Sequence, residues 1–184
     1  AELASVALTA DQTLTVHAAG YDAFNNYLGD QRVTWRSTGS LAPPVSASGT
    51  SFTFTPTTAP ASGTIVASHA TVGSDATGTI SVSPGQPQRV KILVGASGNT
   101  SELTTANLSV GGTLLIHAAS FDADGNYVAD VSVNWNASNG IGTFDPNSGA
   151  STTFTAGAAG TGVITASHAT LQGDQSGQIT VVRP

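Results

Sequence analysis

The 184-residue chain contains no cysteine and no methionine. The absence of cysteine excludes a disulfide framework, a zinc–thiolate site and a cysteine nucleophile. Charged residues make up only 9% of the chain, and five Lys and Arg against eleven Asp and Glu give a formal net charge of −6. So few basic residues form no basic patch, which makes nucleic acid and anionic membrane surfaces poor partners.

Long apolar runs and helical periodicity are also missing. No stretch approaches the roughly 20 apolar residues that span a bilayer, so we expect no membrane insertion. Short alternating segments separated by Gly and Asn turns instead predict an antiparallel all-β fold. The first residue is Ala rather than Met, which fits a mature end after signal-peptide removal and equally a trimmed chain. With a surface rich in Ser, Thr and Gly, this predicts an extracellular, cell-surface location.

One sequence unit occurs twice in the chain. Residues His17–Trp35 and His117–Trp135 align without a gap, as HAAGYDAFNNYLGDQRVTW and HAASFDADGNYVADVSVNW. Each copy alternates as a strand, a turn and a second strand that places its tryptophan on the buried face. We therefore predict one domain at 1–83 and another at 89–184, joined at 84–88 by a short linker that two prolines stiffen.

The alignment of the two copies reveals one asymmetry. Residues 1–10 align with 101–110, so the strand predicted at 89–95 has no counterpart in front of domain 1. A sheet that lacks an edge strand exposes unpaired N–H and C=O groups. Three explanations stay open: the chain is a piece of a longer array, a neighbouring molecule supplies the strand by β-augmentation, or domain 1 is simply shorter.

Both copies carry the pattern aromatic-Asp-x-x-Gly/Asn-Asn-x-x-x-Asp-x-x-Val-x-Trp, which resembles the B-to-C strand region of bacterial Ig-like domains of the intimin and invasin type. Residues Phe154–Gly157 and Gly162–Ala166 are similar to the E and F strands of that family, and Gly177–Val181 resembles its G strand. The resemblance implies two tandem Ig-like antiparallel β-sandwiches. Without the inter-sheet disulfide, these depend on packing around Trp35 and Trp135. Such modules serve as spacers, adhesins and filament parts, so the resemblance implies little about function.

The turn of the second copy carries oxygen ligands at alternating positions, similar to the start of a calcium-binding loop. A full loop needs a bidentate acid where this chain has Val133, and the first copy has Phe24 at one ligand position. The alternatives are a calcium site, the only cofactor site considered, and a turn held by its own hydrogen bonds. The candidate ligands are Asp122, Asp124, Asn126 and Asp130.

The histidines offer little chemistry. His17 and His117 fall opposite the core residues of their strand, whereas His69 and His168 share the core-facing parity. No third ligand follows at a fixed spacing, so metal binding or a pH response competes with a histidine that bonds to backbone. The serine before His69 or His168 points to the opposite strand face and forms no Ser–His pair. We expect no enzyme.

Two further groups of residues are candidates for surface chemistry. Three Asn-x-Ser/Thr sequons, all in domain 2, are candidate glycosylation sites. Aromatic residues gather at the B–C turn of each copy and form either a candidate contact surface for a glycan or a protein, or a plug at the domain junction. The sequons lie at Asn99, Asn107 and Asn136, and the contact residues are Tyr21, Phe24, Tyr27, Phe121 and Tyr127.

These features together predict a non-catalytic extracellular structural protein, a subunit or segment of a cell-surface stalk, adhesin or filament. Its expected partners are other copies of itself or adjacent Ig-like domains, with a neighbouring subunit supplying the strand that domain 1 lacks. The alternative is a carbohydrate- or protein-binding accessory module of a larger secreted protein, which would bind through the exposed aromatic residues.

Overall fold

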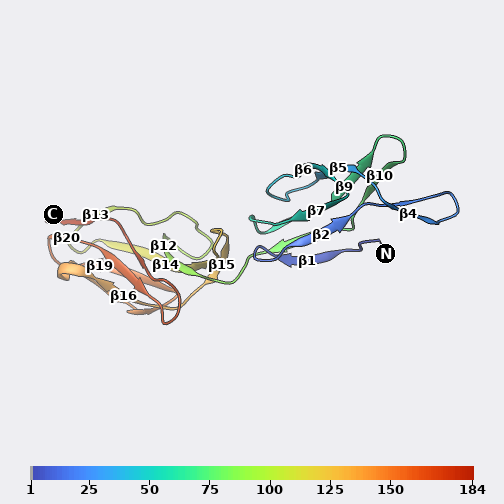
Figure 1. Ribbon diagram of the computed structural model, residues 1–184. Coiled ribbons are helices and arrows are strands. Elements are labelled where there is room, and N and C mark those ends of the chain that lie inside the picture. The colour runs from blue at the N-terminus through green and yellow to red at the C-terminus, as the bar shows by residue number, and fades with distance from the viewer. Residues whose placement is uncertain (1) are drawn as a thin grey trace. The chain divides into compact units, whose positions relative to one another are not determined.

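The computed structural model describes residues 2–184, which divide into two compact units at Gly85–Gln86 (Figure 1). We call them unit 1 and unit 2. Both are β-sandwiches, and the described residues contain no α-helix, only a 3-10 turn at Ser138–Gly140. This confirms the predicted all-β fold of two tandem Ig-like sandwiches. In the described part of the chain, no helix is long and apolar enough to cross a membrane.

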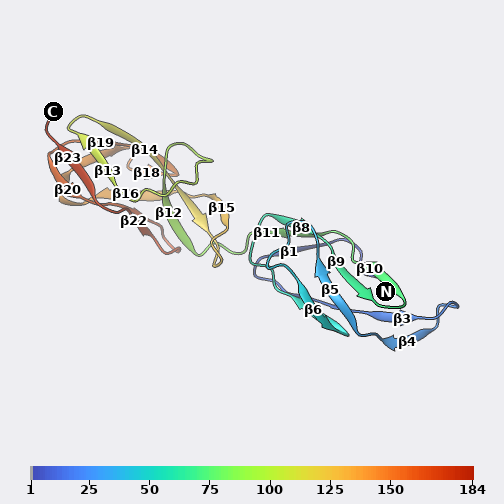
Figure 2. The ribbon, with the colours of Figure 1, turned by 90° about the horizontal axis from the view of Figure 1, so that it is seen from above.

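Unit 2 is a complete sandwich. Its larger sheet has the order β12-β14-β19-β17, with β15 also paired to β14, and the other layer consists of β18-β16-β21-β22 and β13-β23-β20 (Figures 1 and 2). β13 pairs with β23 in parallel, and the other strand pairs of this unit are antiparallel. The bounds are β12 (Arg89–Val94), β13 (Ala106–Ser109), β14 (Thr113–Phe121), β15 (Tyr127–Asp130), β16 (Val133–Ala137), β17 (Gly142–Asp145), β18 (Ser148–Gly149), β19 (Ser151–Ala156), β20 (Gly160–Gly162), β21 (Ile164–Ser167), β22 (Asp174–Gln175) and β23 (Ile179–Val182).

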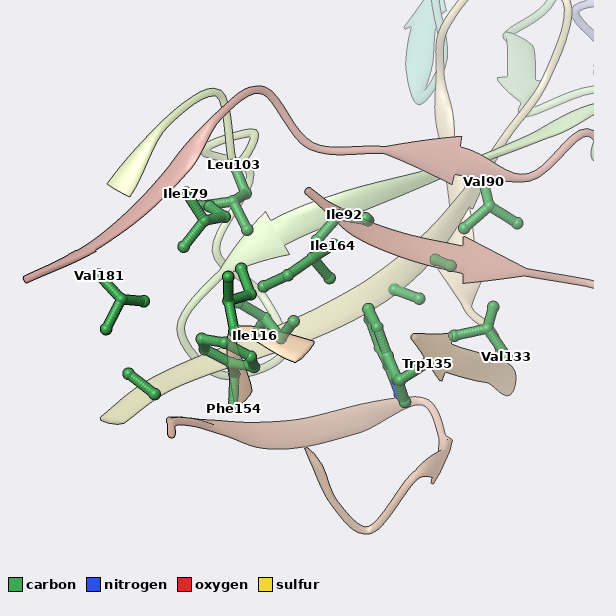
Figure 3. Close-up of a cluster of buried hydrophobic side chains, with 14 residues drawn as sticks. Val90, Ile92, Leu103, Ile116, Val133, Trp135, Phe154, Ile164, Ile179 and Val181 are labelled. Atoms are coloured by element: carbon green, nitrogen blue, oxygen red, sulfur yellow. The ribbon is translucent and has the colours of Figure 1, made fainter. Parts of the chain in front are cut away.

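The core of unit 2 lies between the two layers, because alternate residues of each strand point inward. Figure 3 shows Ile92 and Ile116 of the larger sheet meeting Trp135 and Ile164 of the other layer. The buried indole N–H of Trp135 donates a hydrogen bond of 3.1 Å to the carbonyl of Gly149. The tryptophan therefore fills the core without leaving a buried donor unpaired.

Unit 1 repeats this topology without counterparts of two strands of unit 2. It contains β1-β11-β8, β10-β9-β5-β6, and the pairs β2-β7 and β3-β4. By sequence alignment and pairing, β2 and β3 together correspond to β14, whereas residues 2–85 contain no counterpart of β12 or β17. The bounds are β1 (Val6–Thr9), β2 (Leu14–His17), β3 (Ala19–Tyr21), β4 (Tyr27–Asp30), β5 (Val33–Ser37), β6 (Ser46–Gly49), β7 (Ser51–Phe54), β8 (Ala61–Gly63), β9 (Ile65–His69), β10 (Gly73–Ala76) and β11 (Ile80–Ser83).

Proline explains the absence of a β17 counterpart. Pro43 and Pro44 occupy the aligned positions of Thr143 and Phe144, and proline has no N–H to donate to a sheet. The core still closes here, because the neighbouring residue Val45 is buried. Proline is not the reason that β12 has no counterpart. No segment of residues 2–85 aligns with β12.

Candidate functional site

The clearest difference between the units is the edge of the sheet that β12 covers in unit 2. The side chain of His117 is fully buried, whereas the aligned side chain of His17 is 60% exposed. Phe121 is 8% exposed, against 49% for the aligned Tyr21. We call the strand edge formed by residues 16–21 the open edge.

In unit 2, β12 lies antiparallel to β14 in a continuous register. The pairs run from Arg89 opposite Phe121 to Val94 opposite Ile116. At one end of the ladder the N–H of Gln88 donates to the carbonyl of Phe121. At the other end the N–H of Gly95 donates to the carbonyl of Leu115. The odd-numbered residues of β14 therefore direct their backbone groups toward β12.

The same parity holds in unit 1, where nothing occupies the place of β12. The N–H of Ala18 donates to the carbonyl of Thr50, and its own carbonyl accepts from the N–H of Gln31. Ala18 thus uses its backbone groups on the side of β7 and β4. The backbone groups of His17, Ala19 and Tyr21 face the opposite side, because they alternate along a strand. No strand of residues 2–85 pairs with that side.

The outer side of β12 is also held in unit 2. The N–H of Ile92 donates to the carboxylate of Asp174 at 2.8 Å, and the carbonyl of Ile92 accepts from the N–H of Leu103 at 2.8 Å. β12 therefore lies in a slot with β14 on one side and residues 103 and 174 on the other. In unit 1, residues 2–5 and 76–78 line an open groove of about 570 Å³.

Aromatic side chains stand exposed beside the open edge. Figure 2 shows the β3–β4 hairpin reaching beyond the rest of unit 1. Phe24 at its tip is 87% exposed, and the rings of Tyr21 and Tyr27 lie 5.8 Å apart at 57°. The hydroxyl of Tyr27 donates to the carboxylate of Asp30 at 2.7 Å, and this bond raises the pKa of Tyr27. Leu28, which the sequence analysis did not single out, is also exposed.

The aromatic contact surface predicted for the second copy needs correction. Phe121 is buried, with its ring edge-on to Tyr127 at 6.0 Å, so it does not face solvent. It packs with Ala119 and with Leu93 of β12. β12 covers Phe121 but not Tyr127, which is 39% exposed, so unit 2 exposes one residue of this aromatic pair.

The candidate calcium turn is built by its own hydrogen bonds. The two carboxylate oxygens of Asp122 accept the backbone N–H and the side-chain NH₂ of Asn126, at 2.8 and 2.9 Å. Asp130 instead accepts from the Tyr127 hydroxyl, and Asp124 is exposed. Among residues 2–184, no group of three or more His, Cys, Asp or Glu side chains is arranged to hold a metal ion. Of the two alternatives, these hydrogen bonds favour the self-bonded turn, and the calcium site stays untested.

The first copy contains the same turn. Asp22 accepts from the side-chain NH₂ and backbone N–H of Asn26 and from the backbone N–H of Phe24. The bonds from Asn26, its side chain first, hold the pKa of Asp22 below its usual value. A hydrogen-bonded carboxylate is favoured in its charged form, so the turn is strongest when Asp22 is ionised.

The histidines take structural positions. Nδ1 of His69 accepts the backbone N–H groups of Thr71 and Val72, and Nδ1 of His168 does the same for the residues that follow it. His117 lies on the face opposite the core, as predicted, yet it is buried because Gly95 covers it. Its Nδ1 is 2.9 Å from the Gly95 carbonyl, an acceptor, so Nδ1 carries the proton.

The three candidate glycosylation residues, Asn99, Asn107 and Asn136, are all exposed. Their positions are therefore open to modification, and glycosylation itself stays a prediction.

Comparison with known proteins returned structures rather than sequences. No protein-family model matches the chain, and no curated protein matches it. The D00-D0 domain of intimin is 14% identical over 99% of this chain and 96% of its own, with a TM-score of 0.49. The four N-terminal Ig domains of Dscam1 are 8% identical over 100% of this chain and 44% of theirs, with a TM-score of 0.33. The insect immune protein hemolin is 11% identical over 100% of this chain and 46% of its own, with a TM-score of 0.36.

Of these three structures, the Dscam1 structure is described as a set of Ig domains. This chain spans less than half of the Dscam1 and hemolin structures. Likeness at such low identity concerns the fold and assigns no partner or activity to this chain.

Proposed function

We propose that this chain is a non-catalytic part of an extracellular stalk, adhesin or filament, in which a β-strand from a neighbouring subunit completes unit 1. The main observation that supports this proposal is the open edge. His17, Ala19 and Tyr21 are exposed in unit 1, whereas the aligned His117, Ala119 and Phe121 of unit 2 are buried beside β12.

The shape of the edge supports strand addition over side-chain docking. An open sheet edge presents rows of backbone donors and acceptors that an extended chain satisfies without a specific pocket. His17, Ala19 and Tyr21 direct these groups away from β7, toward the side that β12 occupies in unit 2.

A structural role is also supported by the chemistry of the described residues. Three of the four histidines cap turns or bond to backbone, His17 lies 3.8 Å from Asp30, and the best-placed carboxylate, Asp122, is used by its own turn. The hydroxyl of Thr71 lies 3.2 Å from Nδ1 of His69, but that nitrogen already accepts two backbone N–H groups and so does not act as a free base. Two similar sandwiches in one chain suit a load-bearing or adhesive role, because each is held by many inter-strand hydrogen bonds.

Hydrogen exchange tests the proposal, with unit 2 as an internal control. In the isolated 184-residue chain, the amides of His17, Ala19 and Tyr21 should exchange quickly, and those of His117, Ala119 and Phe121 slowly. In native surface assemblies both sets should exchange slowly. Slow exchange of residues 16–21 in the isolated monomer contradicts completion by a neighbour, because the chain then closes its own edge.

The second candidate function is recognition of a glycan or protein by the exposed aromatic residues. The 87% exposure of Phe24 favours it, because large exposed apolar groups often mark contact sites. Glycan and protein arrays should then lose signal with Tyr27→Ala and keep it with Tyr127→Ala, whose neighbour Phe121 is buried. Equal signal from both variants and the unchanged chain excludes this surface as the binding site.

A further inference from the structure

We infer that the open edge recognises its incoming strand by sequence. The strand carries apolar residues in the pattern of β12 and a lysine opposite Ala19. This inference rests on the proposed completion of unit 1 and specifies the chemistry of the partner.

Unit 2 shows how a lysine at this position is held. Lys91 pairs with Ala119 of β14, and its Nζ lies 2.6 Å from the carboxylate of Glu102. The same Nζ lies 5.5 Å from the centre of the Phe121 ring. The lysine thus meets a carboxylate and an aromatic face at once.

Unit 1 retains these partners although it contains no β12. Glu2 aligns with Glu102, and Tyr21 aligns with Phe121, so the carboxylate and the ring are both present. Asp75 aligns with Asp174, the residue whose carboxylate accepts the N–H of Ile92. Glu2, Tyr21 and Asp75 are all exposed, and Glu2 lines the groove. By this alignment, unit 1 presents a carboxylate at the position where Glu102 of unit 2 holds the ammonium group of Lys91. A basic residue is therefore favoured at that position of the strand.

The apolar positions follow from the parity of β12. Val90 and Ile92 point into the core of unit 2, and Leu93 packs on the other face against Ala119 and Phe121. In unit 1 the corresponding surfaces are Val16 and Ala18 on the inner face and Ala19 and Tyr21 on the outer face. An incoming strand therefore needs apolar side chains on both faces, which gives the pattern apolar-Lys-apolar-apolar.

The pairing of β12 with β14 also sets the direction and register of the incoming strand. The strand runs antiparallel to residues 16–21, as β12 does to β14, and its lysine lies opposite Ala19. The residue two positions beyond the last apolar residue of the pattern takes the place of Gly95, whose carbonyl covers His117. Binding should therefore also bury His17. The inferred partner is an extended segment with this pattern.

The test uses the 184-residue chain and a labelled synthetic peptide with the sequence of residues 86–95, QPQRVKILVG. We expect saturable binding by fluorescence anisotropy. A peptide with Lys replaced by Glu should bind about tenfold more weakly, because it loses an ion pair and a cation–π contact and gains a repulsion. The chain variant Glu2→Lys should reverse this preference. The matched control Glu102→Lys, on unit 2, should leave the preference unchanged.

The contribution of backbone hydrogen bonds to binding is tested by modifying the peptide, which leaves the fold of the chain intact. A methyl group on the amide nitrogen of the peptide lysine removes the N–H that faces Ala19 and should abolish binding. Ala19→Pro in the chain removes the opposing N–H and should have the same effect on peptide binding. Near-ultraviolet circular dichroism verifies that this variant is folded.

The outcomes separate the two proposals. Equal binding of the Lys and Glu peptides overturns the inference and leaves strand completion intact. Failure of every apolar peptide to bind, with residues 16–21 slow to exchange in the monomer, overturns both. Reversal of the preference by Glu102→Lys instead of Glu2→Lys places the peptide on unit 2 and overturns the inference.

Discussion

Replacing Ile92 by alanine measures how much β12 contributes to unit 2. The side chain of Ile92 is fully buried in the core. Its backbone N–H and carbonyl bonds to Asp174 and Leu103 do not involve the side chain, so the substitution removes packing alone. Ile→Ala changes at fully buried positions cost about 2–5 kcal/mol, and we expect about 3 kcal/mol here, because β12 lies at a sheet edge that can partly collapse.

Urea denaturation with hydrogen exchange read by mass spectrometry resolves the two units. With a slope of about 1–3 kcal/mol per M, a loss of about 3 kcal/mol lowers the unfolding midpoint of unit 2 by roughly 1–3 M. Amides of residues 117–121 should also begin to exchange at rates nearer those of residues 17–21, because β12 detaches more often. The unfolding midpoint and the exchange rates of unit 1 should not change.

The control is Lys91→Ala on the same strand. The Lys91–Glu102 pair is partly exposed, and such pairs contribute about 0–1 kcal/mol, so this variant should lose far less stability than Ile92→Ala. Equal loss from the two variants, or unchanged exchange of residues 117–121 in Ile92→Ala, would refute the view that β12 protects this edge by packing.

Three other predictions follow from the described contacts. Trp135→Phe should cost unit 2 about 1–3 kcal/mol in chemical denaturation, because the Gly149 carbonyl loses its indole donor. The pKa of Asp22 is lowered in the folded state, so its contribution to stability is present above the usual value of 3.8 and is lost as the pH falls through the folded pKa. The stability difference between the unchanged chain and Asp22→Asn should therefore narrow in acid unfolding below pH 3.8. Adding calcium or EDTA should leave the melting temperature of unit 2 unchanged, whereas Asp122→Ala should lower it in both conditions, because the carboxylate holds Asn126.

The fold could be predicted because the decisive signals are local and occur twice. Alternation placed the tryptophans inward, and both are buried with their indole N–H bonded to an aligned glycine, Gly49 or Gly149. The alignment of the copies also identified the one segment, 89–95, without a counterpart. Because the same strand and turn pattern occurs in two copies, assignments that fit only one copy can be excluded.

The burial of His117 and Phe121 was not predictable from the same pattern. Alternation assigns a residue to a face of the strand, but it does not say whether a distant segment covers that face. Here the cover comes from Leu93 and Gly95, more than twenty positions earlier in the chain. The prediction therefore held for the facing direction of His117 and failed for the exposure of Phe121.

Strand boundaries failed for a related reason. The sequence predicts one continuous strand over residues 63–71, whereas the structure divides this segment at Thr64, and β8 and β9 join different sheets. The hydroxyl of Thr38 accepts the N–H of Thr64 at 3.0 Å, and the N–H of Thr38 donates to the carbonyl of Thr64. These bonds to a residue 26 positions away form where the chain changes sheets, and neither is visible in a local pattern.

The residues of the open edge argue against a sheet edge built to remain free. Proteins usually block such edges with lysine, proline or inward-pointing charge, because an unblocked edge pairs with other chains. Residues 16–21 read V-H-A-A-G-Y and contain neither lysine nor proline, although position 21 is a tyrosine where unit 2 has phenylalanine. The hydroxyl lowers the cost of exposing the ring in the absence of a strand, and the aromatic face remains. The edge therefore keeps the pairing surface that the proposed completion of unit 1 requires.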